Sequence, residues 1–419
     1  MPSSNVIRCI NLDWLEVHCL EPGEPRNAEY FIAQGYGVQV REYGTRIYRE
    51  MFTVLDDHDC GMIEVRRSPK SRLHSDWECH VRLVNAYCYI DGAAQFMKDF
   101  LDRHGFYVNR ISRIDVCLDF TRFDSGDDPN MFLQRYIRRK YSKINQSNIH
   151  AHGTDEWNGR CWNSVSWGSP SSDVSTKMYN KTLELYDPAT DKFGKPYIRF
   201  AWLKCGLIDD WERCTLKGQA QQIWRVEFSI RSSVKRWFTI EIDGQPRQRH
   251  YKNGDSSKYL QSIPNTLDMY TDRSKLLTMF ASLATHYFHF KKFKQGIRKD
   301  RCPEKPLFYF TGEQYLYHVA KEESVRGGKI NRPISTLLAK IRQYREEHVQ
   351  HDIRQACSVL IKAMENEVMR HETGLFTPEE IKAFQIAVSI HSRTPSHDAA
   401  VLLREVKELL KLNDKTIIF

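Results

Sequence analysis

The sequence predicts an α+β protein in which a domain built on an antiparallel sheet precedes a mostly helical C-terminal domain. Apolar and aromatic residues recur at about every second position in the first half, as in half-buried strands, whereas helical spacing prevails from about residue 311 onward. At roughly 100–200 residues per domain, 419 residues make two or three domains. We assign residues 1–245 to the sheet domain, 246–305 to a basic connecting region and 306–419 to the helical domain.

Local patterns predict the individual elements. Helices are expected over 92–105 and 129–145, the second opening with a proline. Residues 377–380 (TPEE) form a capping box, and 398–412 keeps helical spacing. The stretch 145–173 is polar and rich in Asn, Gly, Ser and Trp. The strands expected from period-two alternation are 7–20, 79–90, 111–121, 174–186 and 222–231.

The composition excludes some classes of protein and allows others. Lys and Arg number 62 and Asp and Glu 53, so the net charge is 62 − 53 = +9, and 12% of residues are aromatic. This allows a nucleic-acid partner without requiring one. No run approaches the roughly 20 apolar residues of a membrane helix, and the start lacks the apolar core of a secretion signal. The 11 cysteines are scattered and form no CxxC pair. We therefore expect a cytoplasmic protein with no membrane partner.

Two aspartates share one face of the strand over 111–121. Side chains alternate along a strand, so Asp115 and Asp119 project from the same face, while the positions between them are apolar. Carboxylates are poor strand formers and need a reason to be there. A metal ion, a basic partner or a solvated, salt-bridged face are the alternatives.

A third carboxylate lies in the strand over 222–231. Glu227 alternates with apolar neighbours and shares its face with Arg225. The structural interpretation is an Arg–Glu ladder across the sheet. The functional one brings Glu227 to the face of Asp115 and Asp119, where three carboxylates would repel one another unless a cation lies among them. Oxygen ligands of this kind suit Mg²⁺ or Mn²⁺.

A tyrosine lies between two lysines in the strand predicted over 174–186. If this strand continues through residue 183, Tyr179 and Lys181 share a face. Flanking lysines could lower the pKa of a phenol and bind phosphate oxygens. Taken alone, a tyrosine in a strand is more often structural.

Together, the three segments resemble the Rep_trans family of rolling-circle replication initiators and the related relaxases of integrative elements. The family pattern is an R-x-D-x-x-x-D strand, a G-S stretch leading to x-Y-x-K-x-x-E, and an R-x-E strand. Here these occur in order as RIDVCLDF (113–120), WGSPSSDVSTKMYNKTLE (167–184) and WRVEF (224–228). The opening strand NLDWLEV (11–17) also looks like the family's first strand. The resemblance covers about residues 10–235 and implies a catalytic domain of the initiator or relaxase type.

That resemblance implies a metal-dependent enzyme that nicks and closes DNA at the origin of a plasmid, phage or mobile element. Tyr179 would attack the phosphodiester, giving a 5′-phosphotyrosine and a free 3′-OH. Lys181 would assist the developing charge, and Glu184 would orient Lys181 or supply a ligand. The implied metal ligands are Asp115, Asp119 and Glu227. Replication initiator, conjugative relaxase and non-catalytic DNA-binding regulator remain open alternatives.

Further residues are candidates for DNA or metal contacts. His150 and His152 form a His–hydrophobe–His triplet, the metal motif of another nicking-enzyme superfamily, although their surroundings have little strand character. Origin DNA, single-stranded or hairpin, is the expected partner, and a host helicase or a second subunit could dock on the helical domain. The candidate DNA-binding residues are Arg113, Arg225, Trp167, Arg138 and Arg139.

Overall fold

The chain divides into two compact units, Met1–Ala320 and Lys321–Phe419. The computed structural model describes residues 7–21, 23–70, 77–143, 149–156, 159–169, 172–186, 195–241, 259–298, 301–310 and 315–319. The second unit, with the predicted helices at 377–380 and 398–412, therefore lies outside the described residues. Among the described helices, none is long and apolar enough to span a membrane.

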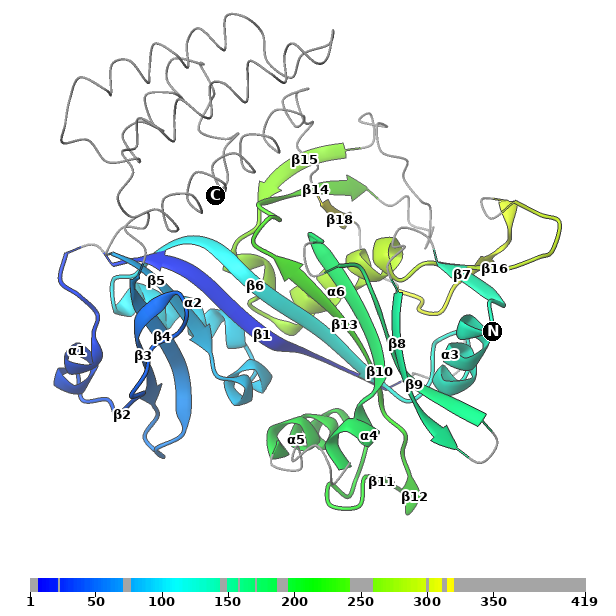
Figure 1. Ribbon diagram of the computed structural model, residues 1–419, viewed down its shortest axis with the longest axis horizontal. Coiled ribbons are helices and arrows are strands. Elements are labelled where there is room, and N and C mark those ends of the chain that lie inside the picture. Colours follow the sequence, from blue (N-terminus) through cyan, green and yellow to red (C-terminus); the bar gives the residue numbers. More distant parts are fainter. Residues whose placement is uncertain are drawn as a thin grey trace, which may run out of the picture. The chain divides into compact units, whose positions relative to one another are not determined.

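A ten-stranded antiparallel sheet forms the centre of the first unit (Figure 1). Its order is β2-β3-β4-β5-β1-β6-β13-β10-β9-β8, so three segments far apart in the sequence become neighbours at β6, β13 and β10. The strands of this sheet are β1 (Arg8–Leu20), β2 (Val38–Val40), β3 (Tyr48–Leu55), β4 (Gly61–Pro69), β5 (Glu78–Leu83), β6 (Tyr107–Phe120), β8 (Ile149–Glu156), β9 (Gly159–Trp167), β10 (Val174–Asn180) and β13 (Trp224–Arg231).

The remaining strands of the described residues form three smaller sheets. They are β11-β12, β15-β14-β18 and β17-β16-β7. Their strands are β7 (Tyr141–Lys143), β11 (Thr215–Leu216), β12 (Gln219–Ala220), β14 (Arg236–Glu241), β15 (Tyr259–Pro264), β16 (Phe290–Lys292), β17 (Glu304–Lys305) and β18 (Tyr315–Val319). The helical elements are α1 (Ala28–Ala33), η1 (Asn85–Tyr89), α2 (Ala93–Arg103), α3 (Pro129–Ile137), α4 (Lys181–Tyr186), α5 (Pro196–Cys205), η5 (Leu267–Tyr270) and α6 (Arg273–Tyr287).

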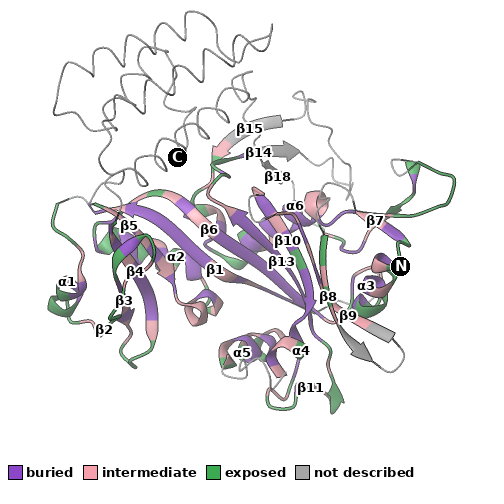
Figure 2. Ribbon diagram, in the orientation of Figure 1, coloured by how far each residue is buried: buried purple, intermediate pink, exposed green. Residues whose placement is uncertain are grey.

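The two faces of the main sheet differ in polarity because side chains alternate along each strand. In β6, Ile114, Val116 and Leu118 lie in the main apolar core, to which α2, α3 and α6 also contribute. The strands at the centre of the sheet are buried along most of their length (Figure 2). We call the opposite face of the sheet, which carries the charged side chains, the polar face. On this polar face, α4 and α5 form a second, smaller core around Trp202. The polar face therefore carries the charged residues that the sequence singled out.

The predicted strand over 174–186 is wrong in its second half. Strand β10 ends at Asn180, and α4 begins at Lys181. The side chain of Asn180 accepts a hydrogen bond from the backbone N–H of Leu183 (3.0 Å), so it caps the first turn of the helix. Lys181 therefore leaves the strand alternation that placed it beside Tyr179.

Other boundaries differ as well. The helix predicted over 129–145 ends at Ile137, because Arg139 adopts a left-handed conformation (φ 58°). The strand predicted over 79–90 ends at Leu83 and continues as η1. The polar stretch 145–173 contains the β8–β9 hairpin.

The unit boundary at Ala320 also differs from the predicted boundaries at 245 and 305. Apolar residues of α6, including Met279 and Phe280, pack into the main core, so this region is part of the first unit rather than a connector. Strand β18 pairs with β14, where a helix was expected.

Candidate active site

Cross-strand registry gathers the predicted site residues on the polar face of the sheet. Tyr179 of β10 lies opposite Arg225 of β13, which lies opposite Asp119 of β6. Two residues away along each strand, and so on the same face, Lys177 lies opposite Glu227. Directly opposite residues have their Cα atoms about 4.5–5.5 Å apart, so these side chains are neighbours.

Arg225 clamps two carboxylates at the centre of this face. Its Nε and Nη2 donate to Oδ1 and Oδ2 of Asp119 at 2.6 and 2.7 Å, and its Nη1 donates to Oδ1 of Asp13 at 2.8 Å. The indole Nε1 of Trp202 donates to Oδ2 of Asp119 at 2.7 Å. Neither Arg225 nor Asp119 is exposed. Both oxygens of Asp119 are therefore occupied, and this carboxylate is structural.

The phenol of Tyr179 donates a hydrogen bond to Oε2 of Glu227 at 3.0 Å. Tyr179 is 6% exposed, but it belongs to neither apolar core. Burial, and next the charge of Glu227, raise the pKa of Tyr179 well above its ordinary value. The phenol is therefore neutral at physiological pH, and its proton points at a carboxylate.

Glu227 is poised to accept that proton. Burial, and next the negative charges of Asp13 and Asp115, raise the pKa of Glu227 to about 7. Burial also raises the pKa of Asp115, although Arg113 opposes it. For Asp13 burial acts in the same direction, but Arg225 and then Lys181 outweigh it and hold its pKa below the ordinary value. Glu227 can thus change its protonation state near neutral pH.

Two lysines lie over the phenol ring. The Nζ of Lys177 is 4.8 Å from the ring centroid of Tyr179, and that of Lys181 is 5.3 Å away. The Nζ of Lys181 donates to Oε2 of Glu184 at 2.7 Å, so Glu184 orients it from the next turn of α4. Lys177 is exposed, whereas Lys181 is 2% exposed. These cations can stabilise a phenolate or phosphate oxygens.

The predicted metal ligands Asp115, Asp119 and Glu227 do not form a metal site. Asp119 is occupied by Arg225 and Trp202, and Nε of Arg113 donates to Asp115 at 2.9 Å. Within the described ranges, no group of three His, Cys, Asp or Glu side chains is arranged to hold a metal ion. The set as predicted therefore does not fit a divalent cation.

Residues missed by the sequence reasoning complete the site. Asp13 lies at a bulge of β1, next to the pairing of Trp14 with Asp115. Tyr89 donates its phenol proton to Asp13. An aspartate inside the apolar alternation of NLDWLEV was a usable signal for Asp13. The sequence of α5 gives no such signal for Trp202.

The structure separates other predicted residues from Tyr179. Trp167 is fully buried, and its Nε1 donates to the hydroxyl of Tyr136 at 2.8 Å, so it cannot stack on a base. It packs with α3 on the apolar face, and the exposed Arg138 and Arg139 follow that helix. Trp167 as a DNA contact is therefore wrong, and both arginines lie beside the opposite face of the sheet from Tyr179.

The two histidines of the His–hydrophobe–His triplet are exposed on β8. His152 lies opposite Ser164, which lies opposite Tyr179, and His150 lies opposite Ser166. They share the polar face but lie two strands from β10, about 10 Å at the usual strand spacing. Metal binding by these histidines stays a prediction.

Comparison with known proteins adds little to this geometry. No family model matches the chain, and no curated protein matches it. Among solved structures, the chain is similar to a rolling circle replication initiator protein from Geobacillus stearothermophilus. The two are 12% identical, the match covers 72% of this chain and 93% of that chain, and the TM-score is 0.39. At this TM-score the similarity carries no argument about fold or function.

Proposed function

We propose that this protein is a DNA nicking and closing enzyme that uses Tyr179 as its nucleophile and starts rolling-circle replication of a mobile element. One observation carries the proposal. A phenol, a carboxylate whose pKa is raised to about 7 and two lysines meet on one sheet face, although they come from β10, β13 and α4. This is the set that attack on a phosphodiester requires: nucleophile, base and cations.

The proposed step follows from these contacts. As the phenol oxygen of Tyr179 bonds to phosphorus, its proton passes to Oε2 of Glu227, and the bond from phosphorus to the 3′ oxygen breaks. The leaving 3′ oxygen takes a proton from solvent. Lys177 and Lys181 stabilise the charge on the non-bridging oxygens. The product is a 5′-phosphotyrosine and a free 3′-OH. Because Tyr179 is only 6% exposed, side chains around it have to move before a phosphate can reach the phenol, and the exposed Lys177 over its ring is one candidate.

A divalent cation is a separate proposal, and no step above depends on it. Besides burial, the charge of Asp13 raises the pKa of Asp115, and the charges of Asp13 and Asp115 raise that of Glu227. A cation that binds beside these three carboxylates would have to displace the guanidinium groups of Arg113 and Arg225 from them. Titration with Mn²⁺, followed by calorimetry, tests this. Asp115→Asn should abolish the binding heat. Asp119→Asn should lower the melting temperature and leave the heat of any folded protein unchanged.

Nicking itself is tested on supercoiled plasmid carrying the DNA that flanks the gene. The wild type should relax the plasmid and remain bound to a 5′ end, whereas Tyr179→Phe should lose this and keep its DNA affinity. Tyr186, whose hydroxyl donates to the carbonyl of Trp211, provides a matched control, and Tyr186→Phe should still nick. Nicking by Tyr179→Phe would refute the assignment. Absence of nicking by the wild type on any DNA of its own element would favour a DNA-binding regulator.

A further inference from the structure

The polar face that carries Tyr179 continues across the sheet as two cross-strand rows rich in arginine. The partners in each row lie directly opposite one another on adjacent strands. The first row is Arg231, Arg113, Glu16, Arg82 and Glu64, from β13 to β4, and the second is Arg110, His18, His80 and Arg66, from β6 to β4. We call the five arginines (Arg66, Arg82, Arg110, Arg113 and Arg231) the arginine shelf.

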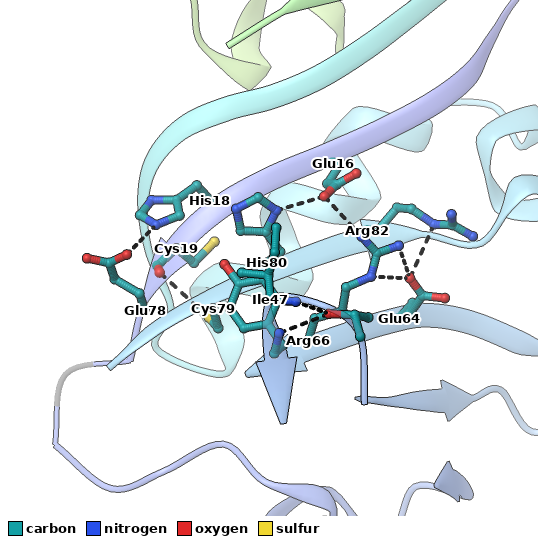
Figure 3. Close-up of polar contacts among 12 residues, drawn as sticks. Glu16, His18, Cys19, Ile47, Glu64, Arg66, Glu78, Cys79, His80 and Arg82 are labelled. Atoms are coloured by element: carbon teal, nitrogen blue, oxygen red, sulfur yellow. Dashed lines mark hydrogen bonds and ion pairs between the residues drawn. The ribbon is translucent and has the colours of Figure 1, made fainter. Parts of the chain in front are cut away.

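In these two rows the acidic side chains are more deeply buried than the arginines. The side chains of Glu16 and Glu64 are only 10% and 4% exposed, whereas those of Arg66 and Arg82 are 22% and 18% exposed. Figure 3 shows both glutamates held by these arginines and by His80. Asp115 repeats the arrangement, with a 2% exposed side chain beneath Arg113. The layer nearer to solvent is therefore cationic.

Three arginines of the shelf keep a donor without an acceptor. In the described part of the chain, the buried Nε atoms of Arg82, Arg110 and Arg231 make no hydrogen bond. Neither Arg110 nor Arg231 forms an ion pair there, in contrast to Arg82, which lies 3.7 Å from Glu64. Buried donors are normally satisfied, so three Nε donors without a hydrogen bond on one face point to a missing acceptor, and the cationic charge of these side chains favours an anionic one.

Trp14 holds part of the shelf in place. Its ring lies 4.1 Å from the guanidinium carbon of Arg82 and 4.5 Å from that of Arg113. Its Nε1 donates to Oε2 of Glu16 at 3.1 Å. Because arginines already contact this ring, Trp14 is a positioning residue rather than a stacking platform. Arginines held in this way lose less conformational entropy when an anion binds.

The spacing of residues along β13 gives the distance from the shelf to Glu227, the hydrogen-bond partner of Tyr179. On β13, Arg231 follows Glu227 by four residues, which is about 13 Å of strand. This equals about four stacked nucleotides of one DNA strand, and fewer when the strand is extended. A strand whose phosphate lies at Tyr179 can therefore reach the shelf along the same sheet face.

We propose that the arginine shelf binds the sugar–phosphate backbone of single-stranded DNA next to the nucleotide that Tyr179 attacks. Its position relative to the cut rests on the proposed function, whereas the binding itself does not. Guanidinium groups match phosphate geometry, and a row of them contacts the backbone without reading bases. Aromatic stacking by Trp14 has no part in it.

The test uses the full chain and a fluorescent oligothymidylate of about 15 nucleotides, measured by anisotropy at several salt concentrations. The double variant Arg110→Gln/Arg231→Gln is chosen because neither arginine neutralises a buried acid. It should bind at least tenfold more weakly, and the slope of log K against log salt should fall by about 1.4, or about 0.7 per lost phosphate contact. Arg103→Gln, an exposed arginine of α2, is the matched control and should bind within about twofold of the wild type.

The outcomes separate this proposal from the proposed function. Equal affinity of the double variant and the wild type, or an equal loss in Arg103→Gln, overturns the shelf. Polyglutamate that displaces the oligonucleotide at equal charge also overturns it, in favour of an acidic polypeptide. Weaker binding by the double variant supports the shelf even when the wild type nicks no DNA, and in that case only the enzymatic role of Tyr179 fails. Trp14→Leu should reproduce part of the loss while its melting temperature reports any unfolding.

Discussion

Replacing Glu227 with glutamine should change how the stability of the first unit depends on pH. The pKa of Glu227 is about 7, against an ordinary value of 4.5, because the carboxyl is buried beside Asp13 and Asp115. The folded state therefore keeps a proton that the unfolded state releases between pH 4.5 and about 7. Folding stability from this group is fully present below pH 4.5 and is lost as pH rises through about 7.

The size of the effect follows from the same values. The gap between 4.5 and about 7 corresponds to about 3 kcal/mol, at about 1.4 kcal/mol for each pH unit. Glutamine stays neutral and can still accept the hydrogen bond from Tyr179. Glu227→Gln should therefore be more stable relative to the wild type at pH 8 than at pH 5, by about 2.5 kcal/mol, because part of the wild-type loss has already occurred at pH 5.

Tryptophan fluorescence during urea unfolding is the suitable assay. Every tryptophan of the chain lies before residue 321, so the signal reports the first unit alone. A chelator removes divalent cations that would hold Glu227 ionised. Glu29→Gln makes the same charge change at an exposed position of α1 and serves as the control. If Glu227→Gln and the wild type show parallel pH dependence, Glu227 does not titrate near pH 7, and its role as base fails as well.

Other substitutions test further contacts. Arg225→Met should lower the free energy of unfolding by about 3–5 kcal/mol, because the buried Asp119 and the half-buried Asp13 lose their partner. Lys98→Met removes an exposed ion pair and should leave the same urea transition nearly unchanged; similar losses would contradict the clamp. The hydrogen bond between Cys205 and Cys9 lowers the pKa of the half-buried Cys205 to about 6. Iodoacetamide should therefore label Cys205 at pH 6.5 faster than the exposed Cys60, as mass spectrometry of peptides can show. Faster labelling of Cys60 would mean that Cys205 is a neutral thiol.

The central strands could be predicted because their alternation is strict. In β6 and β13 every second residue is apolar across the sheet centre, and both strands appear where the pattern put them. The end of β10 could not be found in this way, because a side-chain cap from Asn180 outweighs strand propensity. The β8–β9 hairpin carried a weak signal, since Val165 and Trp167 alternate with serines.

The sequence indicated which residues belong to the candidate site but not which of their side chains contact one another. The family resemblance implied that Tyr179 and Glu227 belong to one site, and strand registry brings them into contact. It gave no means of seeing that Trp202, on a helix far along the chain, donates to Asp119. A contact between distant segments depends on sheet order and on the path of α5, and neither is written in local periodicity.

Asp119 and Glu227 illustrate why alternation alone cannot assign roles. Both are buried acids on the same face of adjacent strands. Asp119 receives two N–H groups from Arg225 and one from Trp202, so both of its oxygens are engaged in hydrogen bonds that hold the sheet and α5 together. Glu227 is hydrogen-bonded to a phenol and is repelled by two neighbouring carboxylates, so the proton-bound form is favoured. The number of N–H donors that reach each acid therefore separates a structural carboxylate from one able to act as a base.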